Sequence, residues 1–135
     1  MTDQIQRITT KGIFAKDGKV LFLQDPRGSW ELPGGKIIFQ EAPEETLERE
    51  IREELNINSF SIGDIVSAWT FVVSRDGNDC QFIVLVYACT AVDEISSHSE
   101  EHISKGWFSL EEIEKMDVRD GYKNALRKYF SRLKT

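Results

Sequence analysis

Seven glutamates lie within the fourteen residues from Glu41 to Glu54. Because neighbouring carboxylates repel one another, this density limits how the segment can be placed in a folded chain. Two arginines accompany them, so the segment carries a local charge of −5 out of −6 for the whole chain. Pro43 suits a first helical turn, good helix formers follow it to Leu55, and Asn56 tolerates the left-handed conformation that ends helices. The segment therefore predicts a helix over 43–55, although Ala42 offers no side-chain acceptor as its cap.

The spacing of residues in this helix separates an acidic face from an apolar one. Glu50, Glu53 and Glu54 fall at i, i+3 and i+4, whereas Leu47, Ile51 and Leu55 form a stripe about a quarter-turn away. Two carboxylates about 5 Å apart repel by roughly 3 kcal/mol at an effective dielectric of about 20, and a hard divalent cation such as Mg²⁺ relieves that repulsion. The acidic face is either an ordinary solvated surface or, if it borders a cleft, a metal and phosphate site.

The rest of the chain alternates strand and helix signals around this segment. Residues 8–24 predict a hairpin with its turn at 16–19, and residues 30–32 predict a short extended piece that the Pro33-Gly34-Gly35 turn ends. Further strands are expected at 57–73, 81–92 and 105–108, the first two in the centre of the sheet and joined by a turn at 75–78. A capping box at 109–112 and an amphipathic pattern over 122–133 predict two closing helices.

Composition limits the classes of protein to which this chain can belong. Its 135 residues, 40% of them apolar, suffice for one domain with a hydrophobic core, and we expect a single domain over 1–135. The longest apolar stretch, 82–91, is too short to span a bilayer, and the first residues lack the apolar core of a secretion signal, which favours the cytoplasm. The negative net charge disfavours nucleic acid polymers and anionic membranes as partners. Cys80 and Cys89 form no CxxC pair and are expected to be small apolar fillers.

The order of residues around the acidic helix matches a known pattern. Gly35, five residues, Glu41, seven residues and then Arg49-Glu50-Ile51-Arg52-Glu53-Glu54-Leu55-Asn56-Ile57 resembles the Nudix box, G-x5-E-x7-R-E-U-x-E-E-x-G-U, where U is bulky and apolar. Asn56 departs from the pattern, which has glycine there, but asparagine tolerates the same positive φ. The approach at 30–35 and the Glu101-His102 pair before Trp107 also look familial.

This resemblance implies an α+β fold, an α/β/α sandwich with a mixed sheet between helices. It also implies a Mg²⁺-dependent hydrolase, with Mn²⁺ as an alternative ion, that acts on a nucleoside diphosphate linked to another group. Glu50, Glu53 and Glu54 resemble the family's metal ligands, and the carbonyl of Gly34 or Gly35 resembles its backbone ligand.

Other residues receive supporting or catalytic roles in this interpretation. Arg49 lies at helical spacing from Glu45 and Glu53, which fits a role in positioning the carboxylates, and Glu41 resembles a position that supports the loop or the metal. Glu54 is the first candidate for general base and Glu101 the second.

Three groups of side chains remain open to a functional or an ordinary interpretation. Arg27 and Lys36 flank the glycine turn and are candidates for phosphate binding. His102 is a candidate substrate contact, although a single loop histidine more often has no catalytic role. The aromatic residues in strand-like runs, among them Trp30, Trp69, Phe71 and Trp107, more often belong to the core than to a base-stacking site.

The resemblance implies a small nucleotide as the substrate, and the absence of subgroup signatures after the box favours a nucleoside triphosphate. We expect hydrolysis of a (d)NTP to a (d)NMP and pyrophosphate. A nucleotide sugar or ADP-ribose is the alternative substrate, and a non-catalytic module that binds nucleotides is the alternative of another class. A homodimer is compatible with the sequence.

Overall fold

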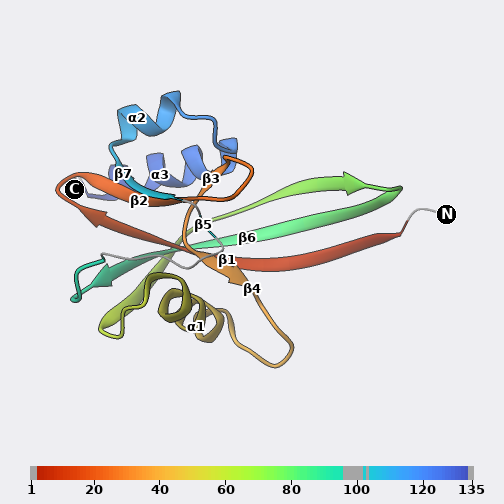
Figure 1. Ribbon diagram of the computed structural model, residues 1–135, viewed down its shortest axis with the longest axis horizontal. Coiled ribbons are helices and arrows are strands. Elements are labelled where there is room, and N and C mark those ends of the chain that lie inside the picture. The colour runs from red at the N-terminus through yellow and green to blue at the C-terminus, as the bar shows by residue number, and fades with distance from the viewer. Residues whose placement is uncertain (1–2, 96–101, 103, 134–135) are drawn as a thin grey trace.

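The computed structural model describes residues 3–95, 102 and 104–133, and in that part of the chain the predicted strands and helices occur in the predicted order. One further strand, at Gly34–Lys36, lies where a turn was predicted, because these residues pair with the first strand. The strands are β1 (Gln4–Lys16), β2 (Lys19–Gln24), β3 (Trp30–Glu31), β4 (Gly34–Lys36), β5 (Phe60–Arg75), β6 (Asn78–Ala91) and β7 (Ser104–Phe108). The helices are α1 (Pro43–Leu55), α2 (Leu110–Lys115) and α3 (Asp120–Arg132). Figure 1 shows α1 on one face of the sheet and α2 and α3 on the other, which confirms the α/β/α sandwich.

The sheet is mixed and is organised around β1. One edge of β1 pairs in parallel with β6 from Gln4 to Phe14, and its other edge pairs antiparallel with β4 and then with β2. The main path through the sheet is β3-β2-β1-β6-β5, with β7 on β2. The expectation that both long apolar strands are central is correct for β6 and wrong for β5, which lies at the edge of this path. Much of β5 alternates between exposed and half-buried residues, the pattern of a strand covered on one face only.

The two predicted hairpin turns are confirmed. Asp17 and Gly18 join β1 to β2 with φ values of 53° and 76°, and Asp76 and Gly77 join β5 to β6 with values of 52° and 77°. Two consecutive residues at positive φ are typical of the tight turns that match the twist of antiparallel strands.

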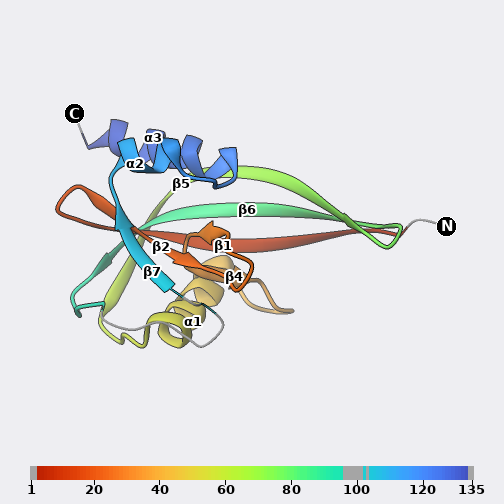
Figure 2. The same cartoon turned by 45° about the horizontal axis from the view of Figure 1, so that its top comes forward.

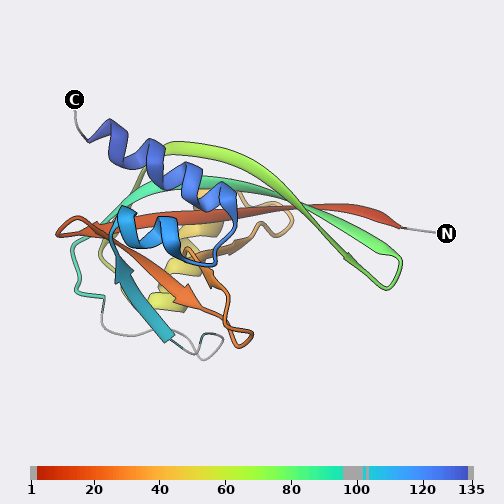
Figure 3. The same ribbon diagram turned by 90° about the horizontal axis from the view of Figure 1, so that it is seen from above.

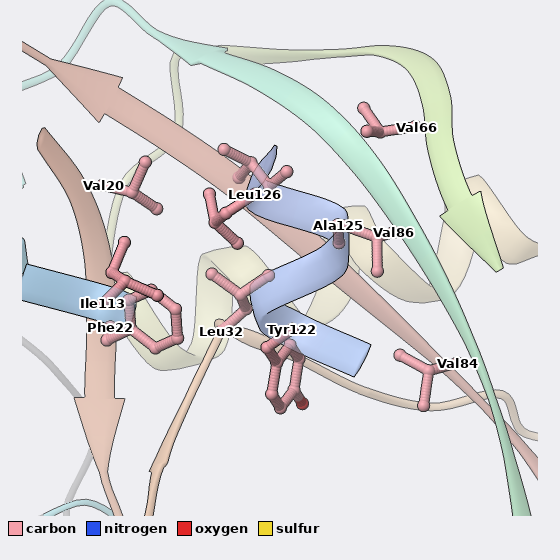
Figure 4. Close-up of a cluster of buried hydrophobic side chains, with 11 residues drawn as sticks. Val20, Phe22, Leu32, Val66, Val84, Val86, Ile113, Tyr122, Ala125 and Leu126 are labelled. Atoms are coloured by element: carbon pink, nitrogen blue, oxygen red, sulfur yellow. The ribbon is translucent and has the colours of Figure 1, made fainter. Parts of the chain in front are cut away.

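Both faces of the sheet carry a buried core. Leu47, Ile51 and Leu55 of α1 are fully buried against one face, as the apolar stripe predicts. On the opposite face, Tyr122, Ala125 and Leu126 of α3 pack over the sheet, and Figure 4 shows them among the valines of β5 and β6. Figure 2, with the top turned forward, shows α2 and α3 together on this face, away from α1.

The ends of α1 agree with the sequence. Ala42 caps the helix in an extended conformation without a side-chain hydrogen bond, and Asn56 ends it at a φ of 53°. The left-handed ending that the Nudix box assigns to glycine is therefore kept by asparagine.

One half of the sheet extends beyond the helices. Figures 1 and 3 show β1, β5 and β6 continuing as a ribbon toward the N-terminus, past the beginning of α3. Phe71 and Phe82 face each other across β5 and β6 at the base of this ribbon. In the part of the chain that the structure describes, no helix is long and apolar enough to cross a membrane.

Candidate active site

The site begins at the glycine turn, where β4 lies between β1 and α1. Gly34 pairs with Lys11 and Gly35 with Thr10. Gly34 has a φ of 144°, and a β-carbon there would lie 1.9 Å from the carbonyl oxygen of Thr10. A β-carbon on Gly35 would lie 2.4 Å from Cδ of Glu50. The close approach of the β1 backbone therefore requires glycine at position 34, whereas a β-carbon at position 35 would displace the Glu50 carboxylate.

A cleft of about 530 Å³ opens beside this turn. Acidic, basic and aromatic side chains from β1, β3, β4, β5, β6, α1 and α3 meet in its walls. They include Lys11, Glu31, Lys36, Arg49, Glu50, Glu54, Phe71, Phe82, His102 and Tyr122. The cleft therefore combines carboxylates and cations beside bare backbone with an aromatic wall.

Glu54 is the most buried carboxylate of the site, with a side-chain exposure of 6%. Its Oε1 accepts a hydrogen bond of 2.7 Å from the backbone N–H of Gly34. Burial raises the pKa of Glu54 to about 7, although Lys11 and the Gly34 hydrogen bond act in the opposite direction. A carboxylate in this environment can exchange a proton near neutral pH.

Arg49 organises the other carboxylates. Its guanidinium donates to Glu41 at 2.8 and 3.0 Å and to Glu50 at 2.9 Å, and it lies 3.6 Å from Glu53. The sequence analysis placed Glu45 and Glu53 within reach of Arg49. The ion pair with Glu53 is present, whereas Glu45 accepts a hydrogen bond from the backbone N–H of Ala42. The hydrogen bonds from Arg49 and Thr46 lower the pKa of Glu41 to about 2. Glu41 thus anchors Arg49 from the loop before the helix.

The cleft also contains Lys11, Glu31 and Tyr122, to which the sequence analysis gave no role in a site. Lys11 is buried, and its Nζ lies 3.7 Å from Oε2 of Glu31. Burial alone would lower the pKa of Lys11, but Tyr122 and the surrounding carboxylates outweigh that effect and raise it. The only sequence signal for Lys11 was a lysine in an otherwise apolar and small stretch of a predicted strand.

His102, which the sequence left open between a substrate contact and an ordinary loop residue, also lines the cleft. Its side chain is 5% exposed, and Nε2 lies 2.9 Å from Oε1 of Glu31. Its Nδ1 lies 3.5 Å from Oε2 of Glu54. The histidine and the glutamates meet through the fold, because they are 71 and 48 residues apart in the sequence.

The remaining candidates divide between the cleft, its surroundings and the undescribed part of the chain. Lys36 lines the cleft and lies 5.9 Å from the centre of the Phe82 ring. Arg27 lines an adjoining pocket of about 410 Å³ together with Trp30 and Arg119. Glu101, the second candidate for general base, lies outside the described residues.

The aromatic candidates lie mainly in packing positions. Phe71 stacks between Trp69 and Phe82, with ring centres 5.4 and 5.0 Å apart, and it lines the cleft. Trp69 and Trp107 belong to the partly buried layers of the two cores. Phe82, which the sequence placed only in an apolar strand, contributes to the aromatic wall.

The donor set suits a hard divalent cation. Glu50 and Glu54 supply carboxylate oxygens beside the glycine turn, and oxygen ligands are those that Mg²⁺ and Mn²⁺ prefer. Glu53 has a 60% exposed side chain, and among the described residues no three acidic, histidine or cysteine side chains are already grouped to hold an ion. The Gly35 carbonyl accepts a 3.3 Å hydrogen bond from the Thr10 hydroxyl. An ion here would therefore draw on a glycine carbonyl or a rotated Glu53 as well as the two cleft carboxylates.

Comparisons with known proteins place these residues in a wider context. The sequence profile of the NUDIX domain matches residues 8–129. The nucleoside triphosphatase NudI of Escherichia coli O139:H28 is 27% identical over 135 residues, which covers 90% of this chain and 95% of NudI. The CTP pyrophosphohydrolase of Escherichia coli K12 is 39% identical over 61 residues, 42% of this chain and 44% of that enzyme. The crystal structure of the MutT protein from Methanosarcina mazei Go1 superimposes with a TM-score of 0.77 at 26% identity and covers 98% of both chains.

Proposed function

Because this chain belongs to the Nudix family of hydrolases, we propose that it cleaves a nucleoside triphosphate to a nucleoside monophosphate and pyrophosphate with the help of a divalent metal ion. The observation that carries the proposal is the meeting of Glu50, Glu54 and the bare Gly34–Gly35 backbone in one cleft with Lys11, Lys36 and Arg49. Carboxylates that bind a cation and basic groups that bind phosphate are the two requirements of phosphoryl chemistry. The printed names of NudI and of the CTP pyrophosphohydrolase support nucleotides as the substrate class.

Each group has a definite task in this proposal. Glu50, Glu53, Glu54 and a carbonyl of Gly34 or Gly35 would hold Mg²⁺, with Mn²⁺ as the alternative. When bound, such an ion polarises phosphoryl oxygens and acidifies bound water. Arg49 keeps Glu50 and Glu53 in place, with Glu41 as its anchor.

Proton transfer and phosphate binding fall to other side chains. Glu54, which also stands among the groups that would hold the ion, is the first candidate to accept the proton of an attacking water. Glu101 remains the second candidate for this role. Lys36 in the cleft and Arg27 in the adjoining pocket would bind phosphate oxygens.

Product analysis tests the proposal. The purified protein is incubated with Mg²⁺ and a panel of ribo- and deoxyribonucleoside triphosphates, nucleotide sugars and ADP-ribose, and the products are separated by ion-exchange chromatography. We expect a nucleoside monophosphate and pyrophosphate from at least one triphosphate. A sugar phosphate as the main product would show that the substrate is a nucleotide sugar or ADP-ribose and not a nucleoside triphosphate. Binding of nucleotides without any product would show that the protein is a nucleotide-binding module and not an enzyme.

The setting of the enzyme is part of the same proposal. We propose one catalytic domain that acts on small nucleotides in the cytoplasm and does not bind nucleic acid polymers or membranes, in line with the net charge of −6. A homodimer is compatible with this activity, and sedimentation equilibrium distinguishes it from a monomer.

A further inference from the structure

A row of polar side chains runs along the wall of the cleft from Lys11 through Glu31 and His102 to Glu54. Lys11 Nζ lies 3.7 Å from Glu31 Oε2, His102 Nε2 lies 2.9 Å from Glu31 Oε1, and His102 Nδ1 lies 3.5 Å from Glu54 Oε2. The side chains of Lys11, His102 and Glu54 are 9%, 5% and 6% exposed. They come from β1, the segment before β7 and α1, and Glu31 of β3 connects them. Four segments distant in the sequence therefore meet in the wall of the cleft, next to the candidate metal site.

The contact between Glu31 and His102 fixes the orientation of the imidazole. The His102 hydrogen bond and the Lys11 charge outweigh the effect of burial and lower the pKa of Glu31, so its carboxylate is an acceptor. His102 Nε2–H must therefore donate to Glu31. Once Nε2 is held in this way, the planar ring determines where Nδ1 points.

The Nδ1 atom of His102 requires an explanation. It is buried, and among the described residues it has no hydrogen-bond partner within normal geometry. A buried polar atom left in this way destabilises the fold. Its nearest acidic neighbour is Oε2 of Glu54, whose Oε1 is already fixed by Gly34.

We propose that Glu31 and His102 are positioning residues that hold the Glu54 carboxylate, with Gly34 N–H on one oxygen and the His102 ring on the other. The proposal rests on the function proposed above, because it assigns a task to Glu54 in that reaction. It makes His102 the link through which β3 and the segment before β7 set the orientation of a residue on α1. Neither Glu31 nor His102 touches the reacting atoms in this proposal.

Two substitutions of His102 separate positioning from a structural role. The amide of His102→Asn lies close to the place of Nδ1 and can still face Glu54, whereas the amide of His102→Gln lies close to the place of Nε2 and can still bind Glu31. We expect Mn²⁺ affinity, measured by electron paramagnetic resonance, and kcat to fall in the order wild type, Asn, Gln, with a loss of 10- to 100-fold for Gln. The melting temperature is expected to follow the other order, with Gln above Asn, because Gln keeps the bond to Glu31.

Two further variants, Glu31→Ala and Ser74→Ala, provide a test of coupling and a control. The effects of Glu31→Ala and His102→Gln on Mn²⁺ affinity are expected to be less than additive, since both release the same carboxylate. Ser74→Ala removes a 2.6 Å hydrogen bond to Asp79 on the distant ribbon and is expected to leave Mn²⁺ affinity and kcat unchanged.

The outcomes distinguish the two proposals. If the wild type hydrolyses no nucleotide, the proposed function fails, and the Mn²⁺ series still decides the positioning role. If the wild type is active and His102→Gln lowers only the melting temperature, with kcat and Mn²⁺ affinity as in the wild type, the positioning role is overturned and His102 is structural.

Discussion

At the scale of single residues, Glu54 combines functional use with a cost in stability. Its pKa of about 7 means that, without metal, the folded protein holds a buried carboxylate that ionises less readily than in the unfolded chain. Above pH 7 the carboxylate is ionised in both the folded and the unfolded protein. Because the ionised form is more stable in the unfolded chain, it lowers the free energy of unfolding. A shift of this size corresponds to about 1–3 kcal/mol after allowance for relaxation.

Glu54→Gln is therefore expected to raise the free energy of unfolding of the metal-free protein by about 1–3 kcal/mol at pH 8, while it lowers kcat by orders of magnitude. The free energy is measured by urea denaturation in EDTA. Glu53→Gln is the matched control, because its side chain is 60% exposed and its effect on stability should stay within about 0.5 kcal/mol. A Glu54→Gln protein that is less stable than the wild type would show that the ionised carboxylate is satisfied in the metal-free fold.

The adjacent glycines are expected to respond differently to the same substitution. In Gly34→Ala the new β-carbon would lie 1.9 Å from backbone at a φ of 144°, so we expect almost no folded protein. In Gly35→Ala it would meet the movable Glu50 side chain, so we expect a folded protein whose kcat is at least tenfold lower. Circular dichroism and a turnover assay check both results.

Gly77→Ala is the control for this pair. It has a φ of 77° with no atom within 4 Å of the new β-carbon, and it should cost only about 1–2 kcal/mol with unchanged turnover per folded molecule. Equal losses of folded protein for Gly34→Ala and Gly35→Ala would contradict the distinction between backbone and side-chain obstruction.

At the scale of elements, α1 begins without a side-chain cap. Ala42 has the extended conformation of a capping residue, and Oε1 of Glu45 already accepts a 3.1 Å hydrogen bond from the Ala42 N–H. Ala42→Ser would complete a capping box and is expected to raise the free energy of unfolding by about 1 kcal/mol without changing kcat. Urea denaturation measures this gain, and Ala42→Val should show none.

The loop before α1 is held by Glu41, and this contact has a defined pH dependence. The pKa of Glu41 is lowered to about 2, chiefly by Arg49 and then by Thr46, so its contribution to stability is complete above the ordinary pKa of 4.5 and disappears as the pH falls toward 2. The difference in unfolding free energy between wild type and Glu41→Gln should therefore be constant from pH 8 to 5 and shrink below pH 4.5. Urea denaturation at each pH measures it.

Glu48→Gln provides the comparison for Glu41→Gln. It removes an exposed 3.9 Å ion pair with Arg52 and should change stability by less than about 0.5 kcal/mol. A difference for Glu41→Gln that persists unchanged to pH 3 would mean that the carboxylate is not the source of the stabilisation.

Local patterns predicted most elements because each is specified within a few residues. The turns at 17–18 and 76–77, the start of α1 at Pro43 and its end at Asn56 all depend on the conformational preference of one or two residues. The edge position of β5 could not be predicted in this way, because it depends on which strands pair with it. The same limit applies to Lys11, Glu31 and His102, which acquire their roles from contacts between segments that are far apart in the sequence.

At the scale of the whole molecule, the cleft links stability to metal binding. Glu50 and Glu54 lie on α1, which packs on one face of the sheet, and Tyr122 of α3 comes from the opposite face. An ion that binds these carboxylates only in the folded state stabilises the entire fold by mass action. This stabilisation is about 2.7 kcal/mol when the ion concentration is one hundred times the dissociation constant.

Addition of Mg²⁺ is thus expected to raise the melting temperature of the wild type by roughly 10 °C near saturation, as measured by calorimetry. The Glu50→Gln/Glu54→Gln double variant should lose most of this shift, since two carboxylates of the cleft are gone. Glu111→Gln, which neutralises an 85% exposed glutamate on α2, should keep it. If Mg²⁺ raises the melting temperature equally in the wild type and the double variant, the ion binds elsewhere on this acidic protein and the cleft is not the metal site.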